Sequence, residues 1–263
     1  MITTIKNQQI KNIIKLMKSS KERREQGLFV VEGVRICKEI PSSLHPIFYV
    51  SEDYYETRKE EVLEILKEEE YELLSKDVFD KIADTKTPQG ILAVVKQPEY
   101  SLEAIEHQQN PVLMVLENLQ DPGNLGTILR SCEAAGVSGV ILSKDTVDLF
   151  NPKVVRSTMG SIFRVPFILN QDMKELLPWL KEHHFTTYAA HLEGKDIYEE
   201  DLLKPIAFFI GNEGNGLSDD TAKAADKKIK IPMSGSVESL NAAIAATILA
   251  YEGKRQRLMS KSL

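Results

Sequence analysis

Short apolar runs alternate with helix-like segments along the second half of the chain. Helical spacing places Leu125, Ile128, Leu129, Cys132 and Ala135 on one face of a helix, and further helices are predicted at residues 173–183 and 239–257. Turn residues bound the apolar runs, a pattern typical of buried parallel strands. The strands predicted in this way are 112–116, 140–142, 165–168, 185–190, 206–210 and 228–231. The alternation predicts an α/β fold with a mostly parallel sheet.

The first hundred residues repeat this alternation on a smaller scale. Ile10, Ile13, Ile14 and Met17 recur at helical spacing and predict a helix over residues 6–25 that ends at Gly27. The other predicted helices are 33–40, 56–69 (with Val62, Leu63 and Leu66 inward) and 76–83, and the predicted strands are 28–31, 47–50, 71–74 and 91–95. We therefore expect a small α/β/α domain over 1–96, a linker over 97–110 and a second domain over 111–263.

Composition narrows the class of protein. The chain is 42% hydrophobic and 27% charged, which is typical of a globular protein, and no apolar run approaches the length of a membrane span. The N-terminus lacks the apolar core of a signal peptide. Cys37 and Cys132 lie far apart and form no CxxC pair, which favours reduced thiols and a cytoplasmic location.

Charge is distributed unevenly. The net charge is −6, but residues 1–40 carry nine Lys or Arg against four Glu, and residues 51–80 carry twelve acids against four bases. A basic helix can bind phosphate whatever the total charge, because salt screens interactions beyond about 10 Å. Lys11, Lys15, Arg23 and Arg24 are therefore candidate RNA contacts. A solvated helix face explains the same charges equally simply.

Several familiar catalytic motifs are absent. Gly211, Gly214 and Gly216 are spaced GxxGxG, which is not the dinucleotide fingerprint, and Leu217 occupies the position that a P-loop gives to lysine. The five histidines lack metal-ligand spacing, and no GxSxG sequence occurs. Classical nucleotide, zinc and serine-hydrolase sites are disfavoured, and no bound metal is expected.

Three polar segments follow apolar strands in the second half. They are residues 124–130, 211–217 and 231–241. Each alone reads simply as a helix start, a turn or a Ser-rich loop. Ligands in open α/β sheets bind at the carboxyl ends of the strands, so together the segments would bring a guanidinium, a carboxylate and two amides into one crevice.

The three segments together resemble the SpoU (TrmH) family of RNA ribose 2′-O-methyltransferases, within the SPOUT superfamily. The NLGTILR sequence from Asn124 is similar to the first family motif, IGNEGNGL from Ile210 to the second, and IPMSGSVESLNAAIA from Ile231 to the third. The likeness covers roughly residues 111–255. The first hundred residues resemble the family's ribosomal-protein-like substrate-binding domain, with FVVEG at 29–33 and TPQG at 87–90 as landmarks.

The resemblance implies a fold and a cofactor. Members of the family have an α/β-knot domain with a deep trefoil knot, an exception to the rule against threading, and they bind S-adenosylmethionine in it. By position, the cofactor-binding residues are Gly211, Ile231 and Leu240, with Ala190 and His191 near the adenosine. The resemblance also implies a homodimer whose active site lies at the interface, and the alanines of the last helix suit close helix packing.

The resemblance assigns roles in methyl transfer to a ribose 2′-hydroxyl. Arg130 acts as a general base or, more in keeping with a guanidinium that stays protonated, as an anchor for the neighbouring phosphate. Asn124 orients that site, and Glu213 holds an arginine or the loop. Ser239 and Asn241 support the cofactor loop and the substrate. Arg156 is a further phosphate candidate, although a surface arginine would look the same.

The expected function is S-adenosylmethionine-dependent methylation of a ribose 2′-hydroxyl, in ribosomal RNA by the two-domain layout. A transfer-RNA 2′-O-methyltransferase, a non-catalytic RNA-binding or ribosome-assembly factor, and a dinucleotide-dependent enzyme are the alternatives. The complete set of polar motif residues argues against a pure binder, and the glycine spacing argues against the dinucleotide enzyme. RNA is the expected partner, with neither a membrane nor a metal ion.

Overall fold

The computed structural model, described here for residues 1–237 and 239–260, forms two compact units. The first consists of Met1–Pro98 with Asp148–Phe163, and the second of Glu99–Val147 with the chain from Arg164 onward. The sequence led us to expect residues 148–163 in the second domain. By packing, these residues group with the first unit, where the ring of Phe29 contacts Phe150 and Phe163 at centroid distances of 4.8 and 6.4 Å.

The first unit has a four-stranded mixed sheet of order β1-β4-β2-β3. Strand β4 is antiparallel to both β1 and β2, and β2 and β3 are parallel. The strands are β1 (Leu28–Glu32), β2 (Ile47–Ser51), β3 (Glu70–Leu74) and β4 (Ile91–Lys96); the helices are α1 (Gln8–Lys18), α2 (Ser20–Gln26), α3 (Val34–Cys37), α4 (Glu52–Thr57), α5 (Lys59–Leu66), α6 (Lys76–Ile82) and α9 (Pro152–Thr158).

Two helices predicted as continuous are broken. Ser19 leaves the helical region (φ −124°, ψ 115°), and its hydroxyl accepts a hydrogen bond from the backbone N–H of Glu22, so it ends α1 and caps α2. Gly27 ends α2 in the left-handed conformation (φ 63°), as predicted. The predicted helix 56–69 is likewise divided into α4 and α5. The prediction that Leu63 points inward is wrong, because Val62, Ile65 and Leu66 fill the core and leave Leu63 44% exposed.

The second unit contains a six-stranded sheet in which every neighbouring pair is parallel. Its order is β10-β8-β9-β5-β6-β7, which confirms the α/β fold with a mostly parallel sheet. The strands are β5 (Val112–Leu116), β6 (Gly139–Ser143), β7 (Phe167–Gln171), β8 (Thr186–Asp196), β9 (Ile206–Ile210) and β10 (Lys227–Lys230); the helices are α7 (Leu102–Glu106), α8 (Pro122–Ala135), α10 (Met173–Glu182), α11 (Asp219–Ala224) and α12 (Ala242–Ser260).

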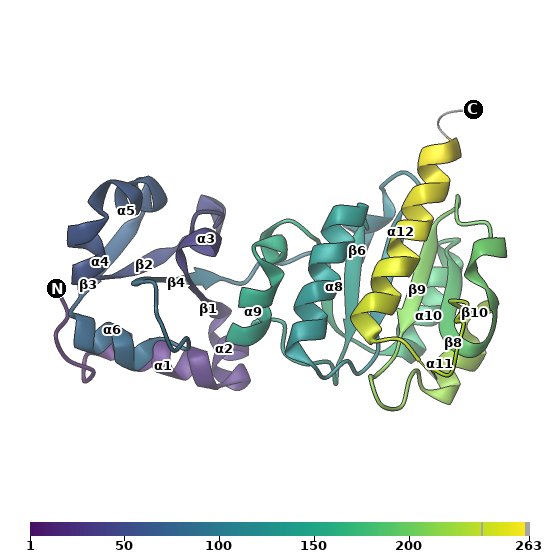
Figure 1. The fold of residues 1–263 in the computed structure, drawn as a ribbon, viewed down its shortest axis with the longest axis horizontal. Coiled ribbons are helices and arrows are strands. Elements are labelled where there is room, and N and C mark those ends of the chain that lie inside the picture. The colour runs from purple at the N-terminus through teal and green to yellow at the C-terminus, as the bar shows by residue number, and fades with distance from the viewer. Residues whose placement is uncertain (238, 261–263) are drawn as a thin grey trace. The chain divides into compact units, whose positions relative to one another are not determined.

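Helices cover both faces of this sheet. Residues of α10 and α11, such as Leu177 and Ala222, share a buried cluster with Val115 and Phe209, whereas α8 and α12 pack against each other and against β5, β6 and β9 on the other face (Figure 1). The predicted apolar face of α8 is buried throughout. Within the described residues, no helix is both long enough and apolar enough to cross a bilayer.

The strand order places a topological switch point between β5 and β9. From β5 the chain proceeds outward through β6 and β7, and it then returns to build β8, β9 and β10 on the other side of β5. The loops that leave β5 and β9 therefore diverge at neighbouring carboxyl ends. Ligands of open α/β sheets bind in the crevice at such a point.

Candidate active site

A pocket of about 480 Å³ lies at this edge of the second unit. Its size falls within the range of small-molecule sites. The pocket is lined by all five residues predicted to bind the cofactor: Ala190, His191, Gly211, Ile231 and Leu240. Glu213 and Ser239, which were predicted to act in catalysis, also line it. Ala242, Ala245 and Leu249 of α12 close the far side. The three polar segments thus converge in part as the sequence predicts.

One side of the pocket is the loop of residues 211–217, which we call the glycine-rich wall. Asn212 and Gly216 exchange two backbone hydrogen bonds of 3.0 and 2.9 Å, and Oδ1 of Asn212 accepts another from the N–H of Gly214. A Cβ on Gly211 would lie 2.0 Å from the carbonyl carbon of Gly216 and 2.1 Å from the nitrogen of Leu217. Only glycine permits this closed turn.

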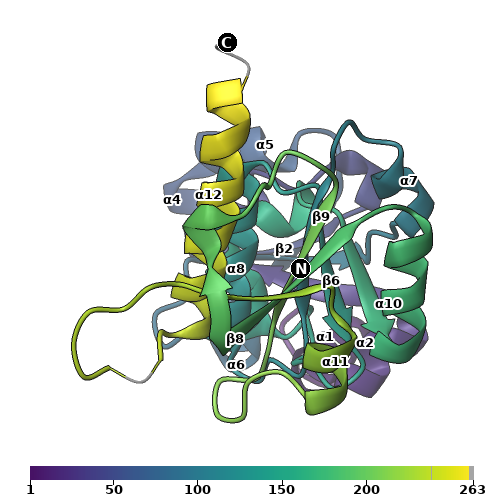
Figure 2. The same ribbon diagram turned by 90° about the vertical axis from the view of Figure 1, so that its right-hand side faces the viewer.

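Another side is formed in part by residues 232–237 and 239–240, which we call the serine-rich loop. Figure 2 shows this loop extending away from the sheet and helices of the second unit. Among its described residues, no hydrogen bond joins it to the rest of the unit. Its first attachment is Asn241, whose Oδ1 accepts from the N–H groups of Ala243 and Ile244 and caps α12.

A chain of side chains connects the three segments. Nδ2 of Asn241 donates to Oδ1 of Asn124 at 3.0 Å, and Nδ2 of Asn124 donates to the carboxylate of Glu213 at 3.0 Å. Because a carboxylate only accepts hydrogen bonds, Glu213 sets the orientation of Asn124, and Asn124 in turn sets that of Asn241. The amide orientations follow from this network.

Glu213 also accepts hydrogen bonds from the backbone N–H groups of Gln120 and Asp121, immediately before α8. Partial burial raises the pKa of Glu213, but the hydrogen bonds from Asn124 and from these two amides outweigh burial and leave the pKa below its ordinary value. Glu213 is thus a carboxylate at neutral pH, and it joins the glycine-rich wall to the start of α8.

Arg130 lies on α8 but outside the pocket lining. Its side chain is exposed, and it has no hydrogen-bond or ion-pair partner among the residues that the structure describes. The neighbouring Ser131 faces α12 and accepts a hydrogen bond of 2.7 Å from the hydroxyl of Thr247. Asn124 and Asn241 also lie outside the lining; Asn124 is bonded to the lining residue Glu213, and Asn241 stands between the lining residues Leu240 and Ala242.

No individual role was predicted from the sequence for two residues at the site. Asn212 organises the glycine-rich wall, and its Nδ2 also donates to the carbonyl of Asn118. Glu117, directly after β5, is only 6% exposed and accepts hydrogen bonds from Ser218 and Thr221. The signal for Glu117 was a single acid at the end of an apolar strand, but its partners lie a hundred residues away.

The predicted RNA contacts divide into two groups. Lys11, Lys15 and Arg24 are exposed on α1 and α2. Arg23 is 3% exposed, because Nε and Nη2 bond Asp148 while Nη1 donates to the carbonyl of Leu16. The prediction that Arg23 binds RNA therefore has to be corrected, since its guanidinium is committed inside the first unit.

Arg156 on α9 is partly exposed and pairs with Asp84 at 2.6 Å. It contributes a cation to the first unit rather than to the pocket. An RNA phosphate would have to compete with Asp84 for its guanidinium.

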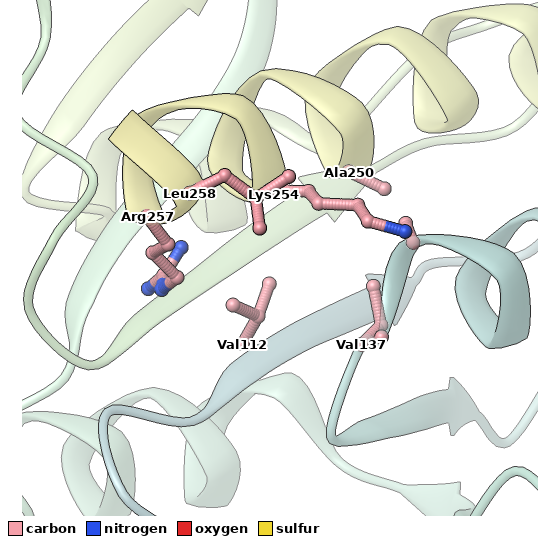
Figure 3. Close-up of a pocket in the computed structure, with 8 residues that line it drawn as sticks. Val112, Val137, Ala250, Lys254, Arg257 and Leu258 are labelled. Carbon is pink, nitrogen blue, oxygen red and sulfur yellow. The ribbon is translucent and has the colours of Figure 1, made fainter. Parts of the chain in front are cut away.

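A second hollow, of about 170 Å³, lies between α12 and the end of α8 (Figure 3). Its floor is apolar, with Val112 and Val137, and its two cations donate to backbone carbonyls: Lys254 to Ala134, and Arg257 to Lys204. Burial lowers the pKa of Arg257. No set of polar groups converges here, so the larger pocket is the better candidate site. Among the described residues, no group of His, Cys, Asp and Glu is arranged to hold a metal ion.

Family models match both parts of the chain. Residues 111–251 match the SpoU rRNA methylase family, and residues 7–93 match the MRM3-like substrate binding domain. The chain belongs to the SpoU rRNA methylase family. The first match contains all three polar segments, and the second contains both landmarks of the first hundred residues.

Individual SpoU relatives match over nearly the whole chain. It is 32% identical over 254 residues to the 23S rRNA (guanosine(2553)-2′-O)-methyltransferase RlmP of Bacillus subtilis, covering 95% of this chain and 97% of the relative. The AdoMet-bound rRNA methyltransferase from Sinorhizobium meliloti is 29% identical, with a TM-score of 0.85 and 97% of each chain covered. The SpoU methyltransferase AviRb from Streptomyces viridochromogenes, in complex with the cofactor AdoMet, is 28% identical, with a TM-score of 0.85 and coverage of 96% of this chain and 98% of AviRb.

Proposed function

We propose that this protein transfers a methyl group from S-adenosylmethionine to a ribose 2′-hydroxyl in ribosomal RNA. The observation that supports this most strongly is the pocket itself, where the second and third SpoU motifs meet and Glu213 connects them to the first. The 2′-O-methyltransferase and AdoMet-bound relatives agree with this activity.

The pocket suits this cofactor chemically. Adenine is neutral and flat, so backbone groups of Gly211, Ile231 and Leu240 are suitable partners, with Ala190 and His191 beside the adenosine. When bound, S-adenosylmethionine supplies a methyl group on a positively charged sulfonium. Apolar Leu217 and Leu249 would shield part of the cofactor from water, and the Glu213 carboxylate favours a cation nearby.

The residues around the pocket would hold the RNA for reaction. Arg130 has no partner among the described residues, so its guanidinium is free to bind the phosphate beside the target ribose in a bidentate manner. Through their hydrogen bonds to each other and to Glu213, Asn124 and Asn241 would hold the end of the serine-rich loop beside the start of α8. Ser239 would support the cofactor loop. This arrangement orients the hydroxyl, which is a poor nucleophile.

We propose that two copies complete the site. Ile244, Tyr251 and Leu258 recur every seven residues along α12 and are 45–58% exposed, which forms an apolar stripe suited to helix packing. Arg130 lies outside the pocket of its own chain and would reach the pocket of the second copy. The deep trefoil knot of the family is part of the same proposal, with α12 as the threaded segment.

We propose that the first unit captures RNA. Lys11 and Lys15 lie one helical turn apart and are exposed on α1, where they would contact phosphates, and Arg24 extends the basic surface on α2. Arg156 would join them if a phosphate displaces Asp84. The cytoplasm, where ribosomal RNA and reduced thiols occur together, is the proposed location.

Calorimetric titration with S-adenosylmethionine and, separately, with NAD tests the cofactor assignment. We expect saturable binding of S-adenosylmethionine and none of NAD. Binding of NAD alone would support a dinucleotide enzyme, and binding of neither would favour a non-catalytic RNA-binding factor.

A further inference from the structure

Glu117 is a buried carboxylate beside the pocket, but it does not line the pocket. It follows β5 and is 6% exposed. Its oxygens accept three hydrogen bonds: from the N–H of Ser218 at 2.8 Å, from the hydroxyl of Ser218 at 2.9 Å and from the hydroxyl of Thr221 at 2.7 Å. All three donors are neutral. These hydrogen bonds connect the end of β5 to Ser218 and Thr221, which lie about a hundred residues later in the chain.

The donors to Glu117 lie where the glycine-rich wall ends. Leu217 and Asp219 line the pocket, and Ser218 stands between them. Hydrogen bonds between Asn212 and Gly216 close the turn, and Glu213 and Asn212 tie its middle to the segment before α8, which leaves the two ends of the wall to be fixed separately. One end continues from β9, and the other is held by Glu117. The backbone N–H of Glu117 also donates to the carbonyl of Ile210, so this residue contacts both ends.

We propose that Glu117 is a positioning residue that sets the affinity of the pocket for S-adenosylmethionine by fixing Leu217–Asp219 without touching the cofactor. This inference rests on the proposed function of the pocket. Loss of the carboxylate leaves the N–H of Ser218 without its acceptor and frees the end of the wall, which shifts Leu217. Binding therefore weakens, while the groups that hold the RNA remain in place.

Three variants separate positioning from general stability. In Glu117→Ala, we expect the Kd and KM for S-adenosylmethionine to rise about tenfold, with kcat at saturating cofactor within about threefold of wild type. Thr221→Val removes one of the three donors at nearly constant volume, and a smaller rise is expected. Glu117→Gln should restore most of the affinity, because its carbonyl can accept from Ser218 N–H while both hydroxyls turn to accept from its amide.

Asp172→Ala provides the matched control. Asp172 also follows a strand and binds the start of a helix: it accepts from the N–H of Lys174 at 2.9 Å and pairs with Lys144 at 3.1 Å, but it lies outside the pocket lining. This variant loses a carboxylate that holds a helix start elsewhere in the same unit, and its cofactor affinity should be unchanged.

Calorimetry and initial-rate kinetics on the full-length variants decide the matter. If wild type does not bind S-adenosylmethionine, both the proposed function and the role of Glu117 are contradicted. If wild type binds but Glu117→Ala binds equally well, only the role of Glu117 is overturned. Should Glu117→Ala fail to fold, an unchanged affinity in Thr221→Val overturns the proposal, and a raised Kd with unchanged kcat supports it.

Discussion

The glycine-rich wall and the serine-rich loop face the same pocket but are attached to the second unit in different ways. The wall is closed on itself by Asn212 and Gly216, and it is tied to the segment after β5 by Glu213 and by Ser218. Among the described residues of the serine-rich loop, no hydrogen bond reaches the rest of the unit, and its first attachment is Asn241.

This difference indicates that the two segments contribute differently to cofactor binding. The wall is preorganised, so little conformational entropy is lost there when a ligand binds. The serine-rich loop is free to adjust, and ordering it would draw on the binding energy of cofactor and RNA. Damage to the wall should therefore weaken cofactor binding strongly, whereas damage at Asn241 should affect turnover more than affinity.

The largest effect is expected from Gly211→Ala. The added Cβ would meet backbone atoms of Gly216 and Leu217 at 2.0 to 2.1 Å, and backbone cannot move aside without opening the turn. Calorimetry should show the affinity for S-adenosylmethionine falling by about a hundredfold or more. Gly214→Ala is the control in the same wall, because its Cβ meets only Oδ1 of Asn212, at 3.4 Å. Equal losses in both variants would contradict a preorganised wall.

An intermediate effect is expected at Asn241, where two substitutions separate its two hydrogen-bonding roles. Asn241→Asp keeps an oxygen to cap α12 but loses the donor to Asn124, whereas Asn241→Ala loses both. We expect kcat to fall about tenfold in both variants, with Tm lowered only in the alanine variant, since a lost cap costs about 1 kcal/mol. Wild-type turnover in Asn241→Asp would show that the bond to Asn124 is dispensable.

The smallest effect on cofactor affinity is expected from lowering the pH. The pKa of Glu213 is lower in the folded protein than the value of 4.5 in the unfolded chain. Ionised Glu213 therefore stabilises the fold fully at pH values above 4.5, and this stabilisation is lost as the pH falls through the pKa of the folded state. Cofactor affinity should stay constant from about pH 8 to pH 5 and decline only below that range. Glu213→Gln, measured from neutral pH to the same acidic pH values, should not show this decline in cofactor affinity. A decline near pH 6 in wild type would indicate a different titrating group.

The sequence was most informative where local pattern and tertiary structure agree. The apolar face of α8 and the strand β9 follow from the local hydrophobic pattern alone. The convergence of Gly211, Ile231 and Leu240 followed from the rule that loops at strand ends meet, together with the family resemblance.

What the sequence did not predict depends on distant partners. Arg23 looked like a surface cation because nothing nearby in sequence indicates Asp148, 125 residues away. Glu117 gave no sign of its bonds to Ser218 and Thr221. Residues 148–163 lie within the SpoU family match, and no local pattern indicated that Phe150 and Phe163 pack against Phe29 in the first compact unit.

Methyl transfer to ribosomal RNA tests the central claim most directly. Ribosomal RNA from a strain lacking this protein would be incubated with S-adenosylmethionine and either wild type or Arg130→Ala, and ribose methylation would then be mapped along the RNA. We expect wild type to restore one 2′-O-methylated nucleotide, and Arg130→Ala to bind the cofactor normally but restore none. Methylation of a base, methylation of transfer RNA alone, or normal turnover by Arg130→Ala would contradict the account.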